Sequence, residues 1–383
     1  MELLEAGYRK QQSGDLRAAE STYRKVLEKE RDNVHALNLL GMICVNEMRP
    51  EEAVEFISRA LEVVADNPQS HANIGLAYKD TGEFEKAIEH LQRAVDLDGG
   101  NPDVLNNLGN VLRAAEKPRE AIKVYERALK LHPTFAECWS NLSAALNEAG
   151  KQDRALKAAG RAIELSPSLA QAYNNRGDIL LAQARYEDAV TAYRKAIELS
   201  PRYTAALINM ARTQRDMDQP DEAQATLNLA LDLEPENPEG LLVQGVLHEQ
   251  MGDRNAAAES FKSAIEIAPE MTVAHYYLAQ IKGRQGTDDE FEAMRALEGK
   301  IKDAPNSRMY LEFGLFRACD QRGLYDEAFQ HLAAGNGIKA ESTPYDDEDT
   351  AQYIADIVDS ARDALQRLGP EPGTQDSRCL LYT

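Results

Sequence analysis

Apolar and small residues recur at three- and four-residue steps along most of this chain, and the whole pattern repeats every 34 residues. In the stretch from 102 to 133, one stripe contains Leu105, Leu108 and Leu112. A second stripe runs from Ala121 to Leu129. Each stripe is typical of an amphipathic helix. Prolines close successive units 34 residues apart, at Pro133, Pro167 and Pro201. A fixed period of this size predicts stacked helix pairs.

Small residues occupy fixed places of this period. Glycine inside a helix costs roughly 0.5–1 kcal/mol relative to alanine, so its recurrence needs a packing reason. One place, in the first helix of each unit, holds Gly7, Gly41, Gly75, Gly109, Ser143, Gly177, Ala211, Gly245 and Ala279. A second-helix place holds alanine from Ala19 to Ala257. We expect these places to let the two helices approach closely while Tyr125, Tyr193 or Phe261 fills the space beside them.

The residues of one unit carry a family resemblance. Trp139, Leu142, Ser143 and Leu146, followed by Ala155, Ala162 and Pro167, resemble the tetratricopeptide repeat. The resemblance implies an all-α solenoid, a right-handed superhelix of about nine to ten helix pairs, with a concave groove lined by first helices. We expect a regular array of eight 34-residue units over 1–270 and degenerate units over 271–340. A capping or bracing amphipathic helix over 341–368 and a linker with a truncated or artefactual tail over 369–383 would follow.

Charge and cysteine content narrow the function. The chain has 43 basic and 64 acidic residues and a formal net charge of −21. This excess of acids opposes binding to nucleic acid, which needs cations to neutralise phosphates, and to anionic membranes. The four cysteines show no pairing or metal spacing, and no signal peptide or long apolar run is present. We expect reduced thiols and a cytoplasmic protein.

The motifs that catalysis requires do not occur in the sequence. There is no GxxxxGK[ST] loop, no GxGxxG after a strand, no HExxH, no paired CxxC and no GxSxG. The seven histidines stand singly within the helical units. We therefore expect no catalytic residue, no cofactor and no metal within the chain, and a scaffold that binds a protein or an extended peptide.

One polar place recurs in five successive first helices. It holds Asn73, Asn107, Asn141, Asn175 and Asn209. An amide offers a donor and an acceptor, which suits a sequence-independent grip on a peptide backbone. The arrangement resembles the asparagine ladder in the repeat arm of O-linked N-acetylglucosamine transferases. In the alternative interpretation, asparagine here belongs to the repeat consensus and bonds neighbouring helices.

Cations accompany these asparagines. Lys79, Arg113 and Arg215 share one place of the repeat, and Arg212 lies close by. They are candidates for the groove, with plain surface charge as the alternative. A clamp for C-terminal carboxylates would need lysine at a place that here carries Asn38, Ala72, Asn106, Ser140 and Asn174. The sequence therefore disfavours that role.

The C-terminal quarter carries a second resemblance. The run from Leu311 through Leu324–Phe329 to Pro344 resembles the junction in bacterial tetratricopeptide-repeat sulfotransferases, where repeats lead into a P-loop-like domain. Pro372-Gly373-Thr374 is not the Ser-Gly-Thr-Thr-type loop of that domain. We expect the substrate- or partner-binding arm of a larger bacterial transferase of this kind. The alternatives are the arm of a glycosyltransferase and a stand-alone adaptor.

Overall fold

The computed structural model describes residues 2–281, 286–301 and 304–342. These residues form twenty α-helices and no strand. In chain order the helices are α1 (Glu2–Gln12), α2 (Leu16–Lys29), α3 (Val34–Asn46), α4 (Pro50–Val63), α5 (Pro68–Asp80), α6 (Phe84–Leu97), α7 (Pro102–Ala114), α8 (Pro118–Leu131), α9 (Ala136–Glu148), α10 (Gln152–Leu165), α11 (Ala170–Ala182), α12 (Tyr186–Leu199), α13 (Thr204–Asp216), α14 (Pro220–Leu233), α15 (Pro238–Gln250), α16 (Arg254–Ile267), α17 (Thr272–Gln280), α18 (Asp288–Glu298), α19 (Pro305–Gln321) and α20 (Tyr325–Ser342).

The helix boundaries repeat because the signals that set them repeat. Proline at the first position starts α4, α8 and α14, where its missing N–H costs nothing. Asparagine side chains cap α3, α5, α7 and α15. Between the two helices of each pair, one residue in the left-handed region ends the first helix, with φ between 55° and 86°. These residues are Gly14, Met48, Gly82, Glu116, Gly150, Ala184, Asp218 and Gly252.

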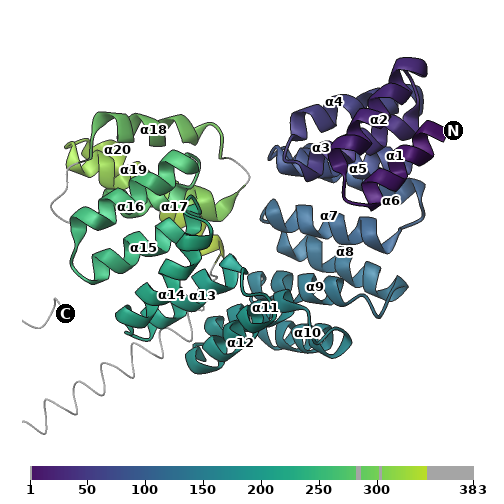
Figure 1. Cartoon of the computed structure of the whole chain (residues 1–383). Helices are drawn as coiled ribbons and strands as arrows, with labels where there is room; N and C mark the ends of the chain where they lie inside the picture. The colour runs from purple at the N-terminus through teal and green to yellow at the C-terminus, as the bar shows by residue number, and fades with distance from the viewer. Residues whose placement is uncertain (1, 282–285, 302–303, 343–383) are drawn as a thin grey trace, which may run out of the picture.

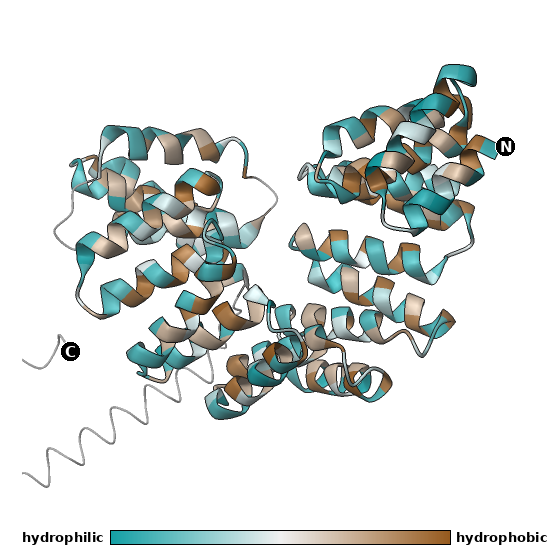
Figure 2. Cartoon of the chain, in the orientation of Figure 1, coloured by the Kyte–Doolittle hydropathy of each residue, from teal (hydrophilic) through white to brown (hydrophobic). Residues whose placement is uncertain are grey.

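A glycine packed against a large side chain joins the helices within a pair. Tyr125 in α8 is fully buried against Gly109 in α7, and Tyr193 takes the same place against Gly177. A Cβ added at Gly109 would lie 2.6 Å from Cζ of Tyr125. The absence of a side chain at Gly109 is therefore the packing reason that the sequence pattern required. Apolar side chains fill the space between helices, and polar ones cover the outer surfaces (Figure 2).

The pairs stack into an arc. Figure 1 shows them following one another from α1 through α9–α12 to α20, so that the first and last units lie on opposite arms. From α3 to α15, each first helix packs against the first helix of the next unit. The second helices pack against first helices and not to any comparable extent against one another. The first helices therefore form the inner face of the solenoid, and the second helices form its outer face.

The helices after α16 leave the 34-residue grid. α17 has only nine residues, whereas α19 and α20 have 17 and 18. Phe291, Met294 and Leu297 of α18 form a separate buried cluster with Leu311 and Leu315 of α19. The expected helix over 341–368 falls almost entirely outside the described residues, and the expected linker and tail over 369–383 fall entirely outside them.

One contact connects the two arms of the arc. The Glu116 carboxylate, at the α7–α8 turn, accepts hydrogen bonds from the Asn306 N–H (3.0 Å) and the Ser307 hydroxyl (3.2 Å). These donors lie in the first turn of α19, whose own N-cap residue, Ala304, provides no side-chain bond. Glu116 thus acts as a cap supplied from a distant repeat, which helps to fix the curvature of the solenoid.

Candidate functional site

The five asparagines of the ladder lie in α5, α7, α9, α11 and α13, at the same place of each first helix. The Asn141 Nδ2 donates to Asn106 Oδ1 at 3.0 Å, and the Asn175 Nδ2 donates to the Ser140 carbonyl at 2.9 Å. Asn73 and Asn209 make equivalent bonds to Asn38 and Asn174 at 3.4 and 3.2 Å. The amide donors of four asparagines therefore join neighbouring first helices.

The amide oxygens of the ladder are not all used in this way. Gln69 donates to Asn73 Oδ1 at 2.8 Å, and Gln171 donates to Asn141 Oδ1 at 3.1 Å. The Oδ1 atoms of Asn107, Asn175 and Asn209 accept no hydrogen bond from any residue that the structure describes. These three oxygens could accept a bond from a ligand.

Asn107 differs from the other four asparagines. The residue 35 places before it is Ala72, which has no polar side chain to bond. Asn107 is half-buried, and within the described ranges its side chain makes no hydrogen bond at all. The pairing rule, which the sequence analysis missed, could have been read from polar residues at 38, 106, 140 and 174. The alanine at 72 then marks the exception.

Three of the four candidate cations are held in ion pairs. The Arg113 Nε lies 3.1 Å from the Glu148 carboxylate of the next first helix. The Lys79 Nζ lies 3.0 Å from Asp80, and the Arg215 Nε lies 3.0 Å from Asp216. Arg212 is half-buried and has no carboxylate within 4 Å among the residues described here. Its nearest electrostatic partner on the inner face is Asp178.

Asp178 is a polar residue of the inner face that the sequence analysis did not single out. Its carboxylate accepts hydrogen bonds from the Tyr193 hydroxyl (2.8 Å), Asn209 (3.0 Å) and Asn174 (3.1 Å). Burial raises the pKa of the Asp178 carboxyl to about 6, although the Tyr193 bond and Arg212 act in the opposite direction. The carboxyl therefore titrates close to neutral pH.

The same place in the unit of α7 holds Asn110, which accepts a bond from the Tyr125 hydroxyl at 2.7 Å. Each buried tyrosine thus reaches through its helix pair and ends on a polar residue of the inner face. Burial raises the pKa of both phenols, so both remain protonated donors at neutral pH. An acid where a neighbouring unit has asparagine was the available signal for Asp178.

Other groups capable of chemistry are dispersed. Cys44, Cys138 and Cys319 are buried free thiols, and burial raises the pKa of Cys138 to about 12. In the part of the chain that the structure describes, no three His, Cys, Asp or Glu side chains gather in a way that could hold a metal ion. None of the described helices combines the length and apolar character needed to cross a membrane.

The helix pairs and their inner face define an α-solenoid. Family models described as tetratricopeptide repeat match residues 11–73, 69–134, 106–168, 145–204, 180–245 and 238–271. These matches cover the chain without a gap from 11 to 271. The chain therefore belongs to the tetratricopeptide repeat family.

Solved structures of similar fold include three repeat proteins. YrrB, described as a tetratricopeptide-repeat protein with an unusual peptide-binding site, is 24% identical, with a TM-score of 0.39, over 48% of this chain and 95% of its own. TTC0263, a thermophilic repeat protein of Thermus thermophilus, is 24% identical, with a TM-score of 0.45, over 47% and 98%. PilF of Pseudomonas aeruginosa is 22% identical, with a TM-score of 0.42, over 53% and 92%. No curated protein matches the chain.

Proposed function

We propose that this chain is a non-catalytic scaffold whose inner face binds an extended polypeptide. The observation that carries the proposal is the set of unbonded amide oxygens of Asn107, Asn175 and Asn209 along successive first helices. An extended peptide has backbone N–H groups that such oxygens can accept, whatever its side chains are. The partner is therefore held mainly through its main chain, with no cofactor and no metal.

The charges of the inner face add a preference to this main-chain recognition. Arg212 is the one of the four candidate cations without a carboxylate within 4 Å among the described residues, and we assign it to the ligand. Lys79, Arg113 and Arg215 contribute less, since a bound peptide would have to compete with their present ion pairs. A peptide with a carboxylate near Arg212 should bind more tightly than its amide analogue.

The test uses two asparagines that differ in their bonds. A random peptide display library, panned on the full chain, supplies the probe peptide. Asn107→Ala removes an amide that bonds to no described residue, so it should weaken binding of that peptide about tenfold and leave the unfolding free energy nearly unchanged. Isothermal titration and urea unfolding measure the two quantities.

Asn141→Ala is the matched control at the same place of the next unit. It deletes the bond to Asn106, and its oxygen is already occupied by Gln171. It should cost about 1 kcal/mol of stability and change peptide affinity little. If instead both variants lost binding and stability together, the asparagines would be structural only and the proposal would fail.

We further propose that the arm serves a larger bacterial transferase in the cytoplasm. The degenerate helices from Leu311 to Phe329 and the following Pro344 support a sulfotransferase-like parent. The buried free thiols Cys44, Cys138 and Cys319 support a reducing compartment. Reading the gene beyond codon 383 tests the parent. A Ser-Gly-Thr-Thr loop would support it, a two-lobed nucleotide-sugar domain would favour a glycosyltransferase arm, and an immediate stop codon would leave an adaptor.

A further inference from the structure

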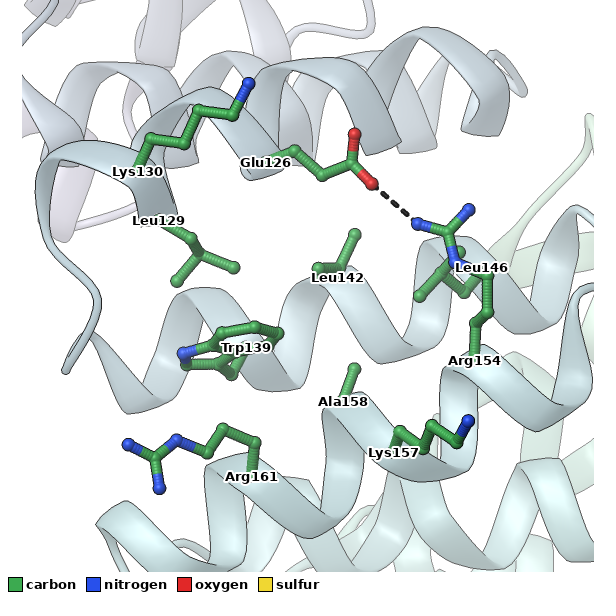
Figure 3. Close-up of a pocket in the computed structure, with 10 residues that line it drawn as sticks. All are labelled: Glu126, Leu129, Lys130, Trp139, Leu142, Leu146, Arg154, Lys157, Ala158 and Arg161. Atoms are coloured by element: carbon green, nitrogen blue, oxygen red, sulfur yellow. Dashed lines mark hydrogen bonds and ion pairs between the residues drawn. The ribbon is translucent and has the colours of Figure 1, made fainter.

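A second hollow lies on the outer side of the solenoid, between the second helices α8 and α10 (Figure 3). It has a volume of about 630 Å³, within the range of ligand-binding pockets. Its floor is apolar and consists of Leu129, Trp139, Leu142, Leu146 and Ala158. None of the inner-face asparagines lines it, so it is independent of the function proposed above.

Trp139 is the single tryptophan of the chain. Its indole Nε1 donates to the Pro133 carbonyl at 2.9 Å, which fixes the plane of the ring. The ring is half-buried and lies between side chains of α8 and α10 (Figure 3). A fixed, partly exposed aromatic ring above buried leucines is a typical anchor point for a partner's apolar side chain.

The rims of the hollow are strongly cationic. Lys130 lies on α8, and Arg154, Lys157 and Arg161 lie on α10, against one carboxylate, Glu126. Glu126 and Arg154 form an ion pair of 2.6 Å across the hollow. Among the described residues, Lys130 and Lys157 have no carboxylate within 4 Å. Two cations are therefore available to a ligand.

The equivalent grooves of the other units do not share this charge. The same ten places between α6 and α8 hold Lys123 and Arg127 against Asp96 and Glu120. Between α10 and α12 they hold Arg176 and Lys195 against Glu164 and Asp188, and between α12 and α14 Arg194 against Glu198 and Glu222. In a chain of net charge −21, this one groove is basic. Solvation of a helix surface would not require such a difference between units.

We propose that the hollow between α8 and α10 binds an acidic amphipathic helix of a partner protein. Apolar residues on one stripe of that helix would cover Trp139 and the leucines, and carboxylates on either side of the stripe would meet Lys130 and Lys157. Charge complementarity selects this partner, because the remaining acidic surface repels it and directs it to this groove.

The probe is a synthetic helical peptide of Leu, Glu and Ala, with leucine at three- and four-residue spacing and no tryptophan. Because Trp139 is the only tryptophan, its emission in the full chain reports directly on the hollow. We expect saturable binding with a shift of emission to shorter wavelength, weakened by salt. A peptide of equal charge with alanine in place of leucine should bind at least tenfold more weakly.

A matched pair of charge variants locates the site. Lys157→Glu with Arg161→Glu should weaken the peptide at least tenfold. Lys123→Glu with Arg127→Glu makes the same change at the same places one unit earlier, so it should change affinity less than about twofold. All four side chains are at the helix surface, and circular dichroism confirms folding.

Equal loss in both charge variants, or binding without a change in Trp139 emission, would overturn the proposal. Self-association of the chain that Lys157→Glu with Arg161→Glu abolishes, without peptide binding, would assign the hollow to a second copy and also overturn it. Asn107→Ala should leave this binding unchanged. The outcome is therefore separate from that of the inner face.

Discussion

The pairs α7–α8 and α9–α10 occupy successive turns of one solenoid and solve the same packing problem differently. In α7–α8, Gly109 has no side chain, and the ring of Tyr125 fills the space. In α9–α10 the glycine becomes Ser143 and the large residue becomes Ala159, and both are fully buried. The Ser143 hydroxyl donates to the Ser140 carbonyl at 2.7 Å within its own helix.

The comparison shows that the repeat fixes the sum of the two side chains more closely than either residue. A small residue on the second helix accompanies a side chain on the first, so the helix axes keep their distance. It also frees the unit from the tyrosine that, in its neighbours, ends on Asn110 or Asp178. The same α9–α10 unit supplies Trp139 and three of the cations of the outer hollow. The unit that departs from the packing rule is thus also the unit with a distinct surface.

The largest expected effect comes from placing the residue of one unit into the other. Gly109→Ser puts a Cβ about 2.6 Å from Tyr125 Cζ, and the ring cannot move away because it is fully buried and its hydroxyl is bonded to Asn110. We expect a loss of about 2 kcal/mol in unfolding free energy, measured by urea unfolding.

The reverse change, Ser143→Gly, is the matched control. It removes a side chain from a site without a large neighbour, and it should cost no more than about 1 kcal/mol from helix propensity. Equal losses for Gly109→Ser and Ser143→Gly would show that the contact with Tyr125 does not limit the first pair.

A double substitution sharpens the same comparison. Ala159→Phe alone should overpack against Ser143 and lower stability. Combined with Ser143→Gly it recreates the Gly245–Phe261 pair that the chain already contains, so the combination should recover about 1–2 kcal/mol. A double-mutant cycle by urea unfolding measures this coupling, and simple additivity of the two changes would contradict it.

The smallest effect concerns the polar ends of the tyrosines. The pKa of Asp178 is raised from 3.8 to about 6, so ionisation opposes folding, and the wild-type chain loses stability as the pH rises through that range. Asp178→Asn matches Asn110 of α7 and removes this loss. The variant should gain about 1 kcal/mol relative to wild type between about pH 4 and pH 7.5, a value reduced for the partial exposure of the carboxylate.

Thermal or urea unfolding of both proteins across this range checks the prediction. Titration of the many surface acids affects wild type and variant alike, so their difference isolates Asp178. A difference that stays constant with pH would mean that the pKa of Asp178 is not raised.

The sequence by itself determined the fold and its register. The 34-residue spacing of Gly109, Ser143 and Gly177, of the alanines and of the closing prolines specifies helix pairs, because a helix packs closely only where small residues recur on one face. The same periodicity placed the five asparagines in equivalent first helices. These are local, repeated signals, and stacked units contact only their neighbours, so local information suffices.

Only the tertiary structure decided what the polar residues do. Whether Asn107 or Asn141 is free depends on a residue 35 places earlier, on a different helix. The pKa of Asp178 depends on how deeply the inner face buries it, and the cap that Glu116 gives α19 joins residues 190 apart. The outer hollow likewise needs α8, α9 and α10 in position before its charges form one surface. Hydrogen bonds, burial and electric fields act between side chains in space, and the curvature of the stack brings those side chains together.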